Sequence, residues 1–180
     1  ALLIRLKSPG PAFYVHNRIG KNGTDLPLLK FRSMYNNAEQ MIQNFTPEQK
    51  AEWEANFKLD HDPRITRMGA FLRRSSMDEL PQLVNVLKGD MSLVGPRPER
   101  PVFVDKFKEE IPRYMIKHQV RPGLTGLAQI SGRDELEIPV KAAFDGEYVK
   151  KINMWKDIQI FLRTIGKVMK RDGVVEGGKK

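Results

Sequence analysis

Two adjacent carboxylates, Asp78 and Glu79, lie in the segment SMDELPQL at residues 76–83. Like charges placed side by side repel each other, and an ordinary helix start needs only one acidic residue. An ionised aspartate is a competent nucleophile toward phosphorus once the phosphate charge is neutralised. A glutamate oxygen is a hard ligand that suits magnesium, which uses only one or two carboxylates. One carboxylate could therefore attack a phosphorus atom while the other holds the metal ion.

The same segment also has a purely structural interpretation. Ser76 precedes Glu79 by three residues, which is the spacing of a helix capping box, and Asp78 would be favoured at the positive end of a helix. Basic residues near the carboxylates are consistent with internal salt bridges or with a site for a phosphorylated, metal-bound substrate. These candidate residues are Lys30, Arg32, Arg73, Arg74, Arg97 and Arg121.

Other catalytic and metal-binding patterns do not compete with this pair. The three histidines, His16, His61 and His118, are too scattered in sequence to indicate a zinc site, and we expect each to be structural or exposed. The chain has no cysteine, which excludes disulfides and thiolate metal sites. Neither a phosphate-binding P-loop, nor a dinucleotide-binding glycine motif, nor a serine nucleophile elbow is found.

The elements that would position these residues are mostly helices. Residues 26–35 read as a strand with a basic end, and residues 36–59 read as helix. Within the helical stretch, Thr46 and Gln49 form a capping box, and Pro47 occupies the first helical position after it. In that helix Trp53 and Phe57, four residues apart, are expected to pack together.

The second half of the chain continues this pattern. A helix is expected from residue 77 or 81 to Lys88 with Gly89 as its C-terminal cap, and another over residues 103–119. Residues 91–101 read as a short strand that leads into a proline-rich loop. The glycine-rich segment 121–133 reads as a loop in which the backbone comes close to something. Many helices with a few short strands predict an α+β fold.

Composition and charge limit the classes of partner. The 180 residues contain 40% apolar and 29% charged residues, which is typical of a globular chain, and the net charge is +9. Residues 141–180 carry ten Lys or Arg and five Asp or Glu, so +5 of that charge lies there. A basic surface favours an anionic partner: a nucleic acid, an anionic lipid or a phosphorylated substrate.

The last helix of the chain is amphipathic. One apolar stripe recurs at spacings of three and four, and it consists of Trp155, Ile158, Leu162, Ile165 and Met169. The basic residues on another face are Lys156, Arg163, Lys167 and Lys170. Such a helix either lies on a membrane surface or docks its apolar stripe on the protein core, and the pattern leaves both interpretations open.

The N-terminal residues 1–6, ALLIRL, are apolar and begin without a methionine. They read as the end of a longer hydrophobic helix, and an ordinary first strand is the alternative. No stretch of about 18 uninterrupted apolar residues occurs in the chain.

Several long segments resemble a known enzyme family. They are SPGPAFYVHNRIGKNG, LLKFRSM, DPRITRMGAFLRRSSMDELPQLVNVLKGDMSLVGPRP and VRPGLTGLAQISGR, in that order. From about Leu3 to Met169 the chain is similar to the bacterial sugar transferases of the monotopic polyprenyl-phosphate phosphoglycosyl transferase family. The resemblance implies one catalytic domain over residues 1–180, with residues 1–6 as the end of a re-entrant membrane helix. Amphipathic helices would lie at the membrane interface.

The resemblance also implies an activity. Family members transfer a sugar-1-phosphate from a UDP-sugar to undecaprenyl phosphate and release UMP, with Mg²⁺, at the cytoplasmic face of the bacterial inner membrane. The products begin capsule, O-antigen, exopolysaccharide or glycoprotein glycan assembly. The implied partners are the UDP-sugar, undecaprenyl phosphate and membrane lipids, without nucleic acid. A homo-oligomer is compatible with the sequence.

The family pattern assigns roles to individual residues. Asp78 would form the covalent phosphosugar intermediate, and Glu79 would help to bind magnesium. The substrate-binding positions would be Lys30, Arg32, Arg73, Arg97 and Arg121. Ser33, Gly146 and Leu127 depart from residues common in the family, so the sugar that is carried is not transferred from any relative.

Two other classes of function remain as alternatives. A basic nucleic-acid-binding module would use the same positive charge, but it would leave the paired acids Asp78 and Glu79 unexplained. A membrane-peripheral scaffold without catalysis would use the C-terminal amphipathic helix and would need neither carboxylate.

Overall fold

A computed structural model describes residues 1–56, 59–132 and 136–170 of the chain. These residues fold as two compact units. The first contains Ala1–Tyr14 and Phe31–Asp78, and the second contains Val15–Lys30 and the residues from Glu79 onward. Helices and a few short strands make up both units, so the predicted α+β class is confirmed. The single catalytic domain stays a prediction.

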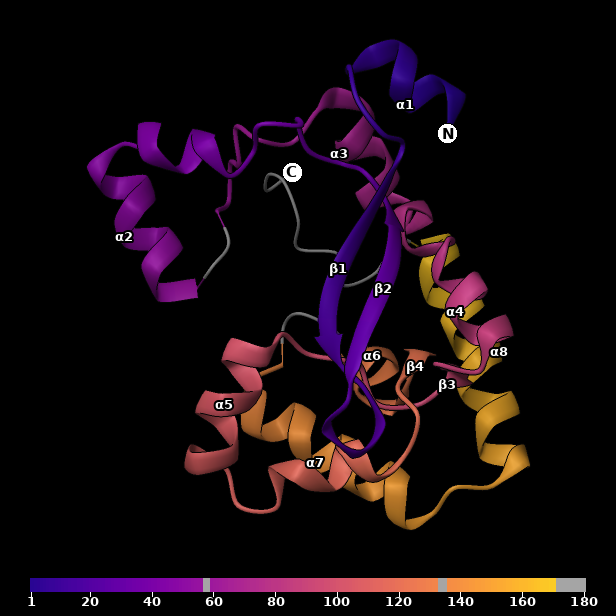
Figure 1. The fold of residues 1–180 in the computed structure, drawn as a ribbon. Coiled ribbons are helices and arrows are strands. Elements are labelled where there is room, and N and C mark those ends of the chain that lie inside the picture. Colours follow the sequence, from indigo (N-terminus) through magenta and orange to yellow (C-terminus); the bar gives the residue numbers. More distant parts are fainter. Residues whose placement is uncertain (57–58, 133–135, 171–180) are drawn as a thin grey trace. The chain divides into compact units, whose positions relative to one another are not determined.

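The first unit is mainly helical (Figure 1). Its elements are α1 (Leu2–Lys7), the 3₁₀ helix η2 (Gln40–Asn44), α2 (Pro47–Asn56) and α3 (Arg67–Arg74). Thr66 caps α3, because its hydroxyl accepts a 2.9 Å hydrogen bond from the backbone N–H of Gly69. The helical conformation of residues 2–7 agrees with the helix that was expected there and not with a strand.

The core of this unit is small and apolar. Ile4 of α1, Ala12 and Leu72 of α3 are buried together, with Phe31 and Met68 packed against them. The apolar side chains on the other faces of α1 are not covered by the described residues: Leu2, Leu3 and Leu6 are exposed. α1 therefore buries one side only.

A hairpin is formed by β1 (Phe13–Ile19) and β2 (Asp25–Phe31), which pair across the 3₁₀ turn η1 (Lys21–Gly23). Asn22 and Gly23 of the turn have positive φ angles, +56° and +78°, which asparagine and glycine tolerate best. In β2, Leu26 and Leu28 are buried in the alternating pattern of a strand.

The second unit carries most of the remaining elements. Its helices are α4 (Gln82–Lys88), α5 (Pro101–Glu110), η4 (Tyr114–Gln119), α6 (Leu127–Ser131), α7 (Ile138–Lys150) and α8 (Met154–Lys170). Two short strands, β3 (Ser92–Val94) and β4 (Gly123–Thr125), pair in parallel with Ser92 opposite Gly123 and Val94 opposite Thr125. Both α4 and α8 contact β3 (Figure 1).

Glycines allow the two short strands to meet closely. A Cβ atom on Gly123 would lie 2.1 Å from the nitrogen of Gly95, and one on Gly126 would lie 2.1 Å from the carbonyl oxygen of Gly95. No side chain fits at either position. The close backbone approach predicted for the glycine-rich segment is therefore confirmed.

Two apolar clusters form the core of the second unit. Val94, Ile130, Tyr148 and Ile160 are buried in one cluster. Leu26, Leu28 and Met91 are buried in the other, with Val86 packed against them.

Three sequence-based boundaries were wrong. The helix expected over residues 103–119 ends at Glu110, because Pro112 disfavours helical backbone at the residue before it, and η4 follows. The loop expected over 121–133 contains β4 and α6. The helix expected over 36–59 is η2 followed by α2, and the capping box of Thr46 and Gln49 is confirmed by hydrogen bonds of 3.0 and 3.2 Å.

One predicted contact lies partly outside the described residues, because Phe57 is not among them. Among the described residues, Trp53 packs edge-on against Phe45, with 6.2 Å between ring centroids, and the Arg64 guanidinium lies 4.2 Å from the Trp53 ring centroid. These contacts fix α2 against the segment that precedes α3.

The last helix, α8, packs on the protein through a face other than its apolar stripe. Ile160 is buried and the Thr164 hydroxyl lies 2.7 Å from that of Thr125 in β4, so this face of α8 packs on the protein. The apolar stripe lies elsewhere and is exposed; it consists of Trp155, Ile158, Leu162, Ile165 and Met169. The core-docking interpretation of the stripe is therefore wrong. Within the described part of the chain, every helix is too short or too polar to cross a membrane.

Candidate active site

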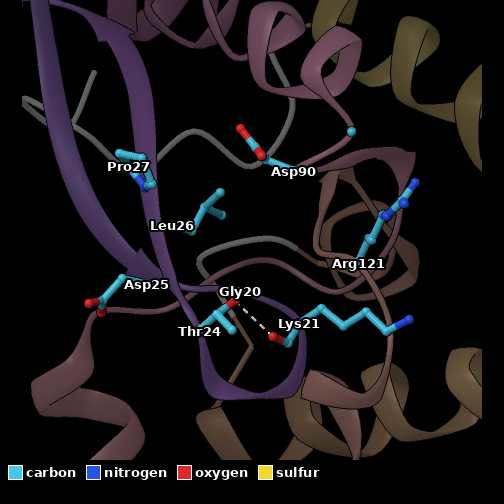
Figure 2. Close-up of a pocket in the computed structure, with 9 residues that line it drawn as sticks. Gly20, Lys21, Thr24, Asp25, Leu26, Pro27, Asp90 and Arg121 are labelled. Atoms are coloured by element: carbon cyan, nitrogen blue, oxygen red, sulfur yellow. Dashed lines mark hydrogen bonds between the residues drawn. The ribbon is translucent and has the colours of Figure 1, made fainter.

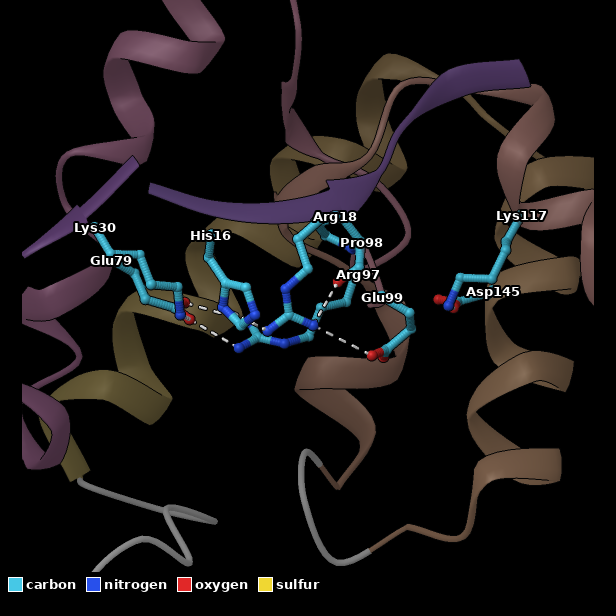
Figure 3. A network of polar contacts seen from close by, with 9 residues as sticks. All are labelled: His16, Arg18, Lys30, Glu79, Arg97, Pro98, Glu99, Lys117 and Asp145. Atoms are coloured by element: carbon cyan, nitrogen blue, oxygen red, sulfur yellow. Dashed lines mark hydrogen bonds and ion pairs between the residues drawn. The ribbon is translucent and has the colours of Figure 1, made fainter. Parts of the chain in front are cut away.

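Glu79 is held between two cations in the second unit (Figure 3). The Lys30 ammonium donates to Oε1 of Glu79 at 2.8 Å. The Arg97 guanidinium donates through Nη2 to Oε1 at 2.7 Å and through Nη1 to Oε2 at 3.3 Å. The side chains of Lys30 and Glu79 are only 15% and 16% exposed, whereas that of Arg97 is 42% exposed.

Three distant stretches of sequence bring these residues together. Lys30 lies near the end of β2, Glu79 ends the 3₁₀ helix η3 (Met77–Glu79), and Arg97 follows β3 in the segment GPRP. Pro96 and Pro98 flank Arg97, are both buried, and restrict the backbone that carries it. The predicted grouping of Lys30, Glu79 and Arg97 therefore matches the structure.

The surroundings of Glu79 favour its ionised form. Burial alone raises the pKa of a carboxyl group, but the adjacent Arg97 and Lys30 outweigh burial and hold the pKa of Glu79 well below its usual range. The carboxylate stays charged at neutral pH and directs both oxygens to cations. Ser76 has a φ angle of +55°, which is not the extended backbone of an N-cap residue. The salt-bridge interpretation of Glu79 therefore describes the structure better than the capping box does.

Further polar residues surround this triad, and sequence reasoning missed them. His16 and Arg18 lie two residues apart on β1, on one face of the strand, and the Arg18 Nη2 atom is 3.4 Å from Nδ1 of His16. Arg18 also reaches the carbonyl oxygen of Pro98 and the carboxylate of Glu99, both at 3.5 Å. The sequence shows three consecutive polar residues here, His16, Asn17 and Arg18, and this run without alternation did not indicate which of them face the triad.

His16 is kept neutral in this cluster. Burial is the main cause that lowers its pKa, and the positive charges of Arg18, Arg100, Lys30 and Arg97 lower it further, to about 3. A neutral imidazole does not compete with the cations for anions at physiological pH.

Three predicted site residues, Asp78, Arg73 and Arg32, belong to the first unit. Asp78 is half-buried at the end of that unit and precedes Glu79 directly in the chain. Arg73, at the end of α3, donates from Nε to the hydroxyl of Ser33 at 2.8 Å. The predicted roles of Asp78 and Arg73 stay predictions.

Arg32 forms hydrogen bonds to the backbone of the protein. Its side chain is buried, and its two terminal nitrogens donate to the carbonyl oxygens of Pro9 and Ser8 at 2.6 and 2.7 Å. These bonds fix the loop between α1 and β1. The expected contact of Arg32 with substrate stays a prediction, and its described bonds are to backbone.

Arg121 lines a cavity of about 230 Å³ in the second unit (Figure 2). Lys21 and Asp90 also line it, and none of its nine lining residues belongs to the Glu79 cluster. Arg121 is exposed. The structure therefore separates Arg121 from the cations that bind Glu79, although sequence reasoning placed them in one candidate set.

A second buried ion pair lies in the same unit (Figure 3). The Lys117 ammonium is 2.7 Å from Oδ2 of Asp145, and the two side chains are 6% and 3% exposed. This pair joins η4 to α7. Breaking a buried pair leaves an uncompensated charge, so its role here is to fix how these two elements pack.

The acidic residues of the cluster are compatible with a metal ion that a substrate brings. Among the described residues, no group of three or more His, Cys, Asp or Glu side chains could form a protein-built metal site. Magnesium commonly binds through one or two carboxylates, with phosphate and water as the other ligands. Oε2 of Glu79 makes the longer of the contacts to Arg97, 3.3 Å, and is the oxygen suited to such a ligand role.

Nearly the whole chain is similar to known proteins. The family model described as bacterial sugar transferase matches residues 1–171. The undecaprenyl-phosphate galactose phosphotransferase of Salmonella typhimurium is 46% identical over 167 residues, which are 91% of this chain and 34% of that protein. The UDP-glucose:undecaprenyl-phosphate glucose-1-phosphate transferase of Escherichia coli is 41% identical over 172 residues, which are 93% of this chain and 34% of that protein.

A shorter relative aligns over more of its own length. The exopolysaccharide production protein ExoY of Rhizobium meliloti is 42% identical over 166 residues, 91% of this chain and 72% of that protein. The chain spans about a third of the length of the longer relatives. Since the family model covers nearly all of the chain and includes the Asp78–Glu79 pair with its cations, this protein belongs to the bacterial sugar transferase family.

Proposed function

We propose that this chain is the catalytic part of an enzyme that transfers a sugar-1-phosphate from a UDP-sugar to undecaprenyl phosphate. The proposal is supported by relatives above 40% identity whose names contain these two substrates. The observation that carries it is the Asp78–Glu79 pair. Glu79 is ionised and accepts hydrogen bonds from Lys30 and Arg97. A cluster of this kind binds and neutralises phosphate oxygens, which phosphoryl transfer requires.

The first chemical step uses Asp78 as the nucleophile. A carboxylate oxygen of Asp78 attacks the phosphorus that bears the sugar, and a phosphorus–oxygen bond forms. The bond from this phosphorus to the bridging oxygen of the diphosphate breaks, and UMP leaves with that oxygen and its electron pair. The product on the protein is an aspartyl-phosphosugar.

In the second step the lipid phosphate takes the group from Asp78. An oxygen of undecaprenyl phosphate attacks the same phosphorus, the bond to Asp78 breaks, and the carboxylate is restored. Two successive displacements let a water-soluble donor and a lipid acceptor use the same cations in turn. Lys30 and Arg97 stabilise the phosphoryl charge in both steps.

Magnesium would be held by Glu79 together with phosphate oxygens of the donor, and when bound it would supply charge neutralisation. In the Glu79→Gln variant we expect a large loss of magnesium-dependent turnover, because an amide oxygen is a weaker ligand for a hard cation. An unchanged magnesium titration would exclude Glu79 as a ligand.

The site of action is proposed to be the cytoplasmic face of the bacterial inner membrane. The exposed apolar stripe of α8, with Trp155 and Leu162 at 68% and 61% exposure, supports a helix that lies in the membrane interface. The acceptor is a lipid, so the chemistry must take place at a membrane surface.

The nucleophile is tested by the Asp78→Asn variant of the full-length protein. UMP release from a panel of UDP-sugars, with undecaprenyl phosphate present, should fall roughly 1,000-fold or more for the one sugar that the wild type uses. Asp105→Asn is the matched control, since Asp105 is exposed on α5, and it should retain wild-type rates.

A second measurement follows the intermediate. Intact-protein mass spectrometry after mixing with donor alone should show an adduct of one sugar phosphate on the wild type and none on Asp78→Asn. Undiminished UMP release from the Asp78→Asn variant would refute the nucleophile role.

A further inference from the structure

Arg18 is a partly buried cation whose described polar contacts are long. Its side chain is 13% exposed, and its polar contacts to described residues are 3.5 Å to the carbonyl of Pro98, 3.5 Å to Glu99 and 3.4 Å to His16. Its buried Nε atom has no hydrogen-bond partner among the residues that the structure describes. Burying a guanidinium without close partners costs free energy, so this arrangement suits an additional anion.

The charges around Arg18 also leave room for an anion. Among the described residues, the charged groups that act most on Arg18 are the cations Arg97 and Arg100 and the carboxylates Glu99 and Glu79. Counting Arg18 itself, three positive charges lie with two negative ones among these described residues. Glu79 is already bound by Lys30 at 2.8 Å and by Arg97 at 2.7 Å, so it does not neutralise Arg18 by direct contact.

The electrostatics of Arg18 agree with this geometry. Burial is the first cause that lowers the pKa of Arg18, to about 10, and Arg97 and Arg100 lower it further, whereas Glu99 and Glu79 partly oppose this. Arg18 stays charged at neutral pH. A further negative charge would offset the repulsion that Arg97 and Arg100 exert on Arg18.

We propose that Arg18 is a donor-binding residue that contacts the diphosphate of the nucleotide sugar, exchanging its long contact to Glu99 for phosphate oxygens. The planar guanidinium matches phosphate geometry through two parallel N–H donors. Arg18 shares the cluster with Arg97 and Lys30 (Figure 3), so one diphosphate group would be held from β1 as well as from β2 and the GPRP segment. This inference rests on the proposed function for the identity of the anion.

A purely structural role for Arg18 makes different predictions. In that case Arg18 would only tether the segment Pro98–Glu99 to β1, and its loss would lower stability or turnover while nucleotide affinity stayed the same. Glu99 would then be a helpful partner, and removing its charge would weaken the protein.

The first test measures binding of UDP to the full-length protein by isothermal titration calorimetry, with Mg²⁺ present. Arg18→Gln should weaken UDP binding at least tenfold. Arg18→Lys should give an intermediate UDP affinity, because lysine keeps the positive charge but lacks the two parallel N–H donors of the guanidinium. Lys106→Gln, which removes an exposed cation on α5, is the control and should bind UDP as the wild type does. Thermal unfolding of each variant reports whether it folds.

The second test uses Glu99 in a double-mutant cycle. Glu99→Gln should tighten UDP binding severalfold, because Arg18 is released toward the phosphates. In the Arg18→Gln background the same change should give much less gain, since the group that Glu99 restrains is absent. A loss of affinity in Glu99→Gln, or equal effects in both backgrounds, would overturn the proposal, as would a wild type that does not bind UDP.

UDP binding needs no turnover, which separates this inference from the proposed function. A wild type that binds UDP through Arg18 but releases no UMP from any UDP-sugar would refute the transfer reaction and leave the anion site in place. Conversely, active enzyme with unchanged UDP affinity in Arg18→Gln would refute the anion site alone.

Discussion

The ionised state of Glu79 follows from its two partners. A carboxylate with a side chain only 16% exposed would become neutral more readily if it were alone, and here Arg97 and Lys30 keep it charged. The same contacts order both cations in the absence of substrate. Glu79 therefore preorganises the positive groups that the proposed reaction needs.

A stability measurement checks this arrangement. Glu79→Gln should lower the free energy of unfolding by about 2 kcal/mol at pH 7, because charged hydrogen bonds to Lys30 and Arg97 are weakened. The folded-state pKa of Glu79 is depressed, so its contribution is fully present above 4.5, the ordinary pKa of a glutamate side chain, and is lost as pH falls below that value. The difference from wild type in urea unfolding should therefore shrink steadily below about pH 4.5.

Glu110→Gln is the matched control, because Glu110 is exposed at the end of α5. Its unfolding should follow the wild type at every pH. A difference for Glu79→Gln that stays constant down to acid pH would show that the side chain acts through packing and not through its charge.

Two helical glycines, Gly69 in α3 and Gly146 in α7, differ in how closely their surroundings pack. Packing therefore decides how replacing each with alanine changes the free energy of unfolding. In α3, a Cβ atom on Gly69 would lie 1.8 Å from the carbonyl oxygen of Ser33, whose hydroxyl binds Arg73. In α7, a Cβ atom on Gly146 would meet nothing within 4 Å. The same substitution should therefore have opposite effects in the two helices.

Gly69→Ala should destabilise the protein by about 3 kcal/mol, since backbone must move to relieve the clash. Gly146→Ala should stabilise it by about 0.5–1 kcal/mol, because alanine loses less backbone entropy than glycine in a helix. Denaturant unfolding of both variants measures the contrast. Equal effects of the two changes would contradict the close contact between α3 and Ser33.

The molecule combines a net charge of +9 with an apolar stripe on α8 that does not pack on the protein. Charge alone favours any polyanion, but an exposed row of large apolar side chains favours a lipid surface. These two features together favour a membrane over a nucleic acid as the anionic partner.

Binding to vesicles with anionic lipid should test this combination. Leu162→Glu places a charge in the apolar stripe and should weaken vesicle binding by about tenfold or more in a sedimentation assay. Gln159→Glu adds the same charge on the same helix outside the stripe and should have a much smaller effect. Because Leu162 is 61% exposed, thermal stability should change little.

A salt series separates the two contributions. Raising the salt concentration should weaken the electrostatic part of vesicle binding and leave the apolar part of the wild type in place. Tight, steeply salt-dependent binding of duplex DNA, together with unaltered vesicle binding by Leu162→Glu, would favour the nucleic-acid alternative.

Local features of the sequence were predicted well because their physics is local. The capping residues Thr46 and Gln49 and the helix-ending glycine Gly89, which has a φ angle of +82°, act on neighbouring backbone. The break at Pro112 was equally local, but the prediction ran the helix through it. The amphipathic period of α8 was also visible, although not which of its faces would be buried.

The sequence alone determined the family and the α+β class, because long motifs and helical periodicity are local features of the chain. It also made Asp78 and Glu79 the candidate catalytic pair, and their roles stay a prediction. Only the tertiary structure decided which cations bind Glu79, that Arg32 binds backbone carbonyls, and that Arg18 joins the Glu79 cluster. Which side chains contact each other depends on the topology of the chain and on which residues are buried. Residues such as Arg18 and Pro98, separated by 80 positions, therefore carry no sequence signal of their contact until the strands and loops between them have folded.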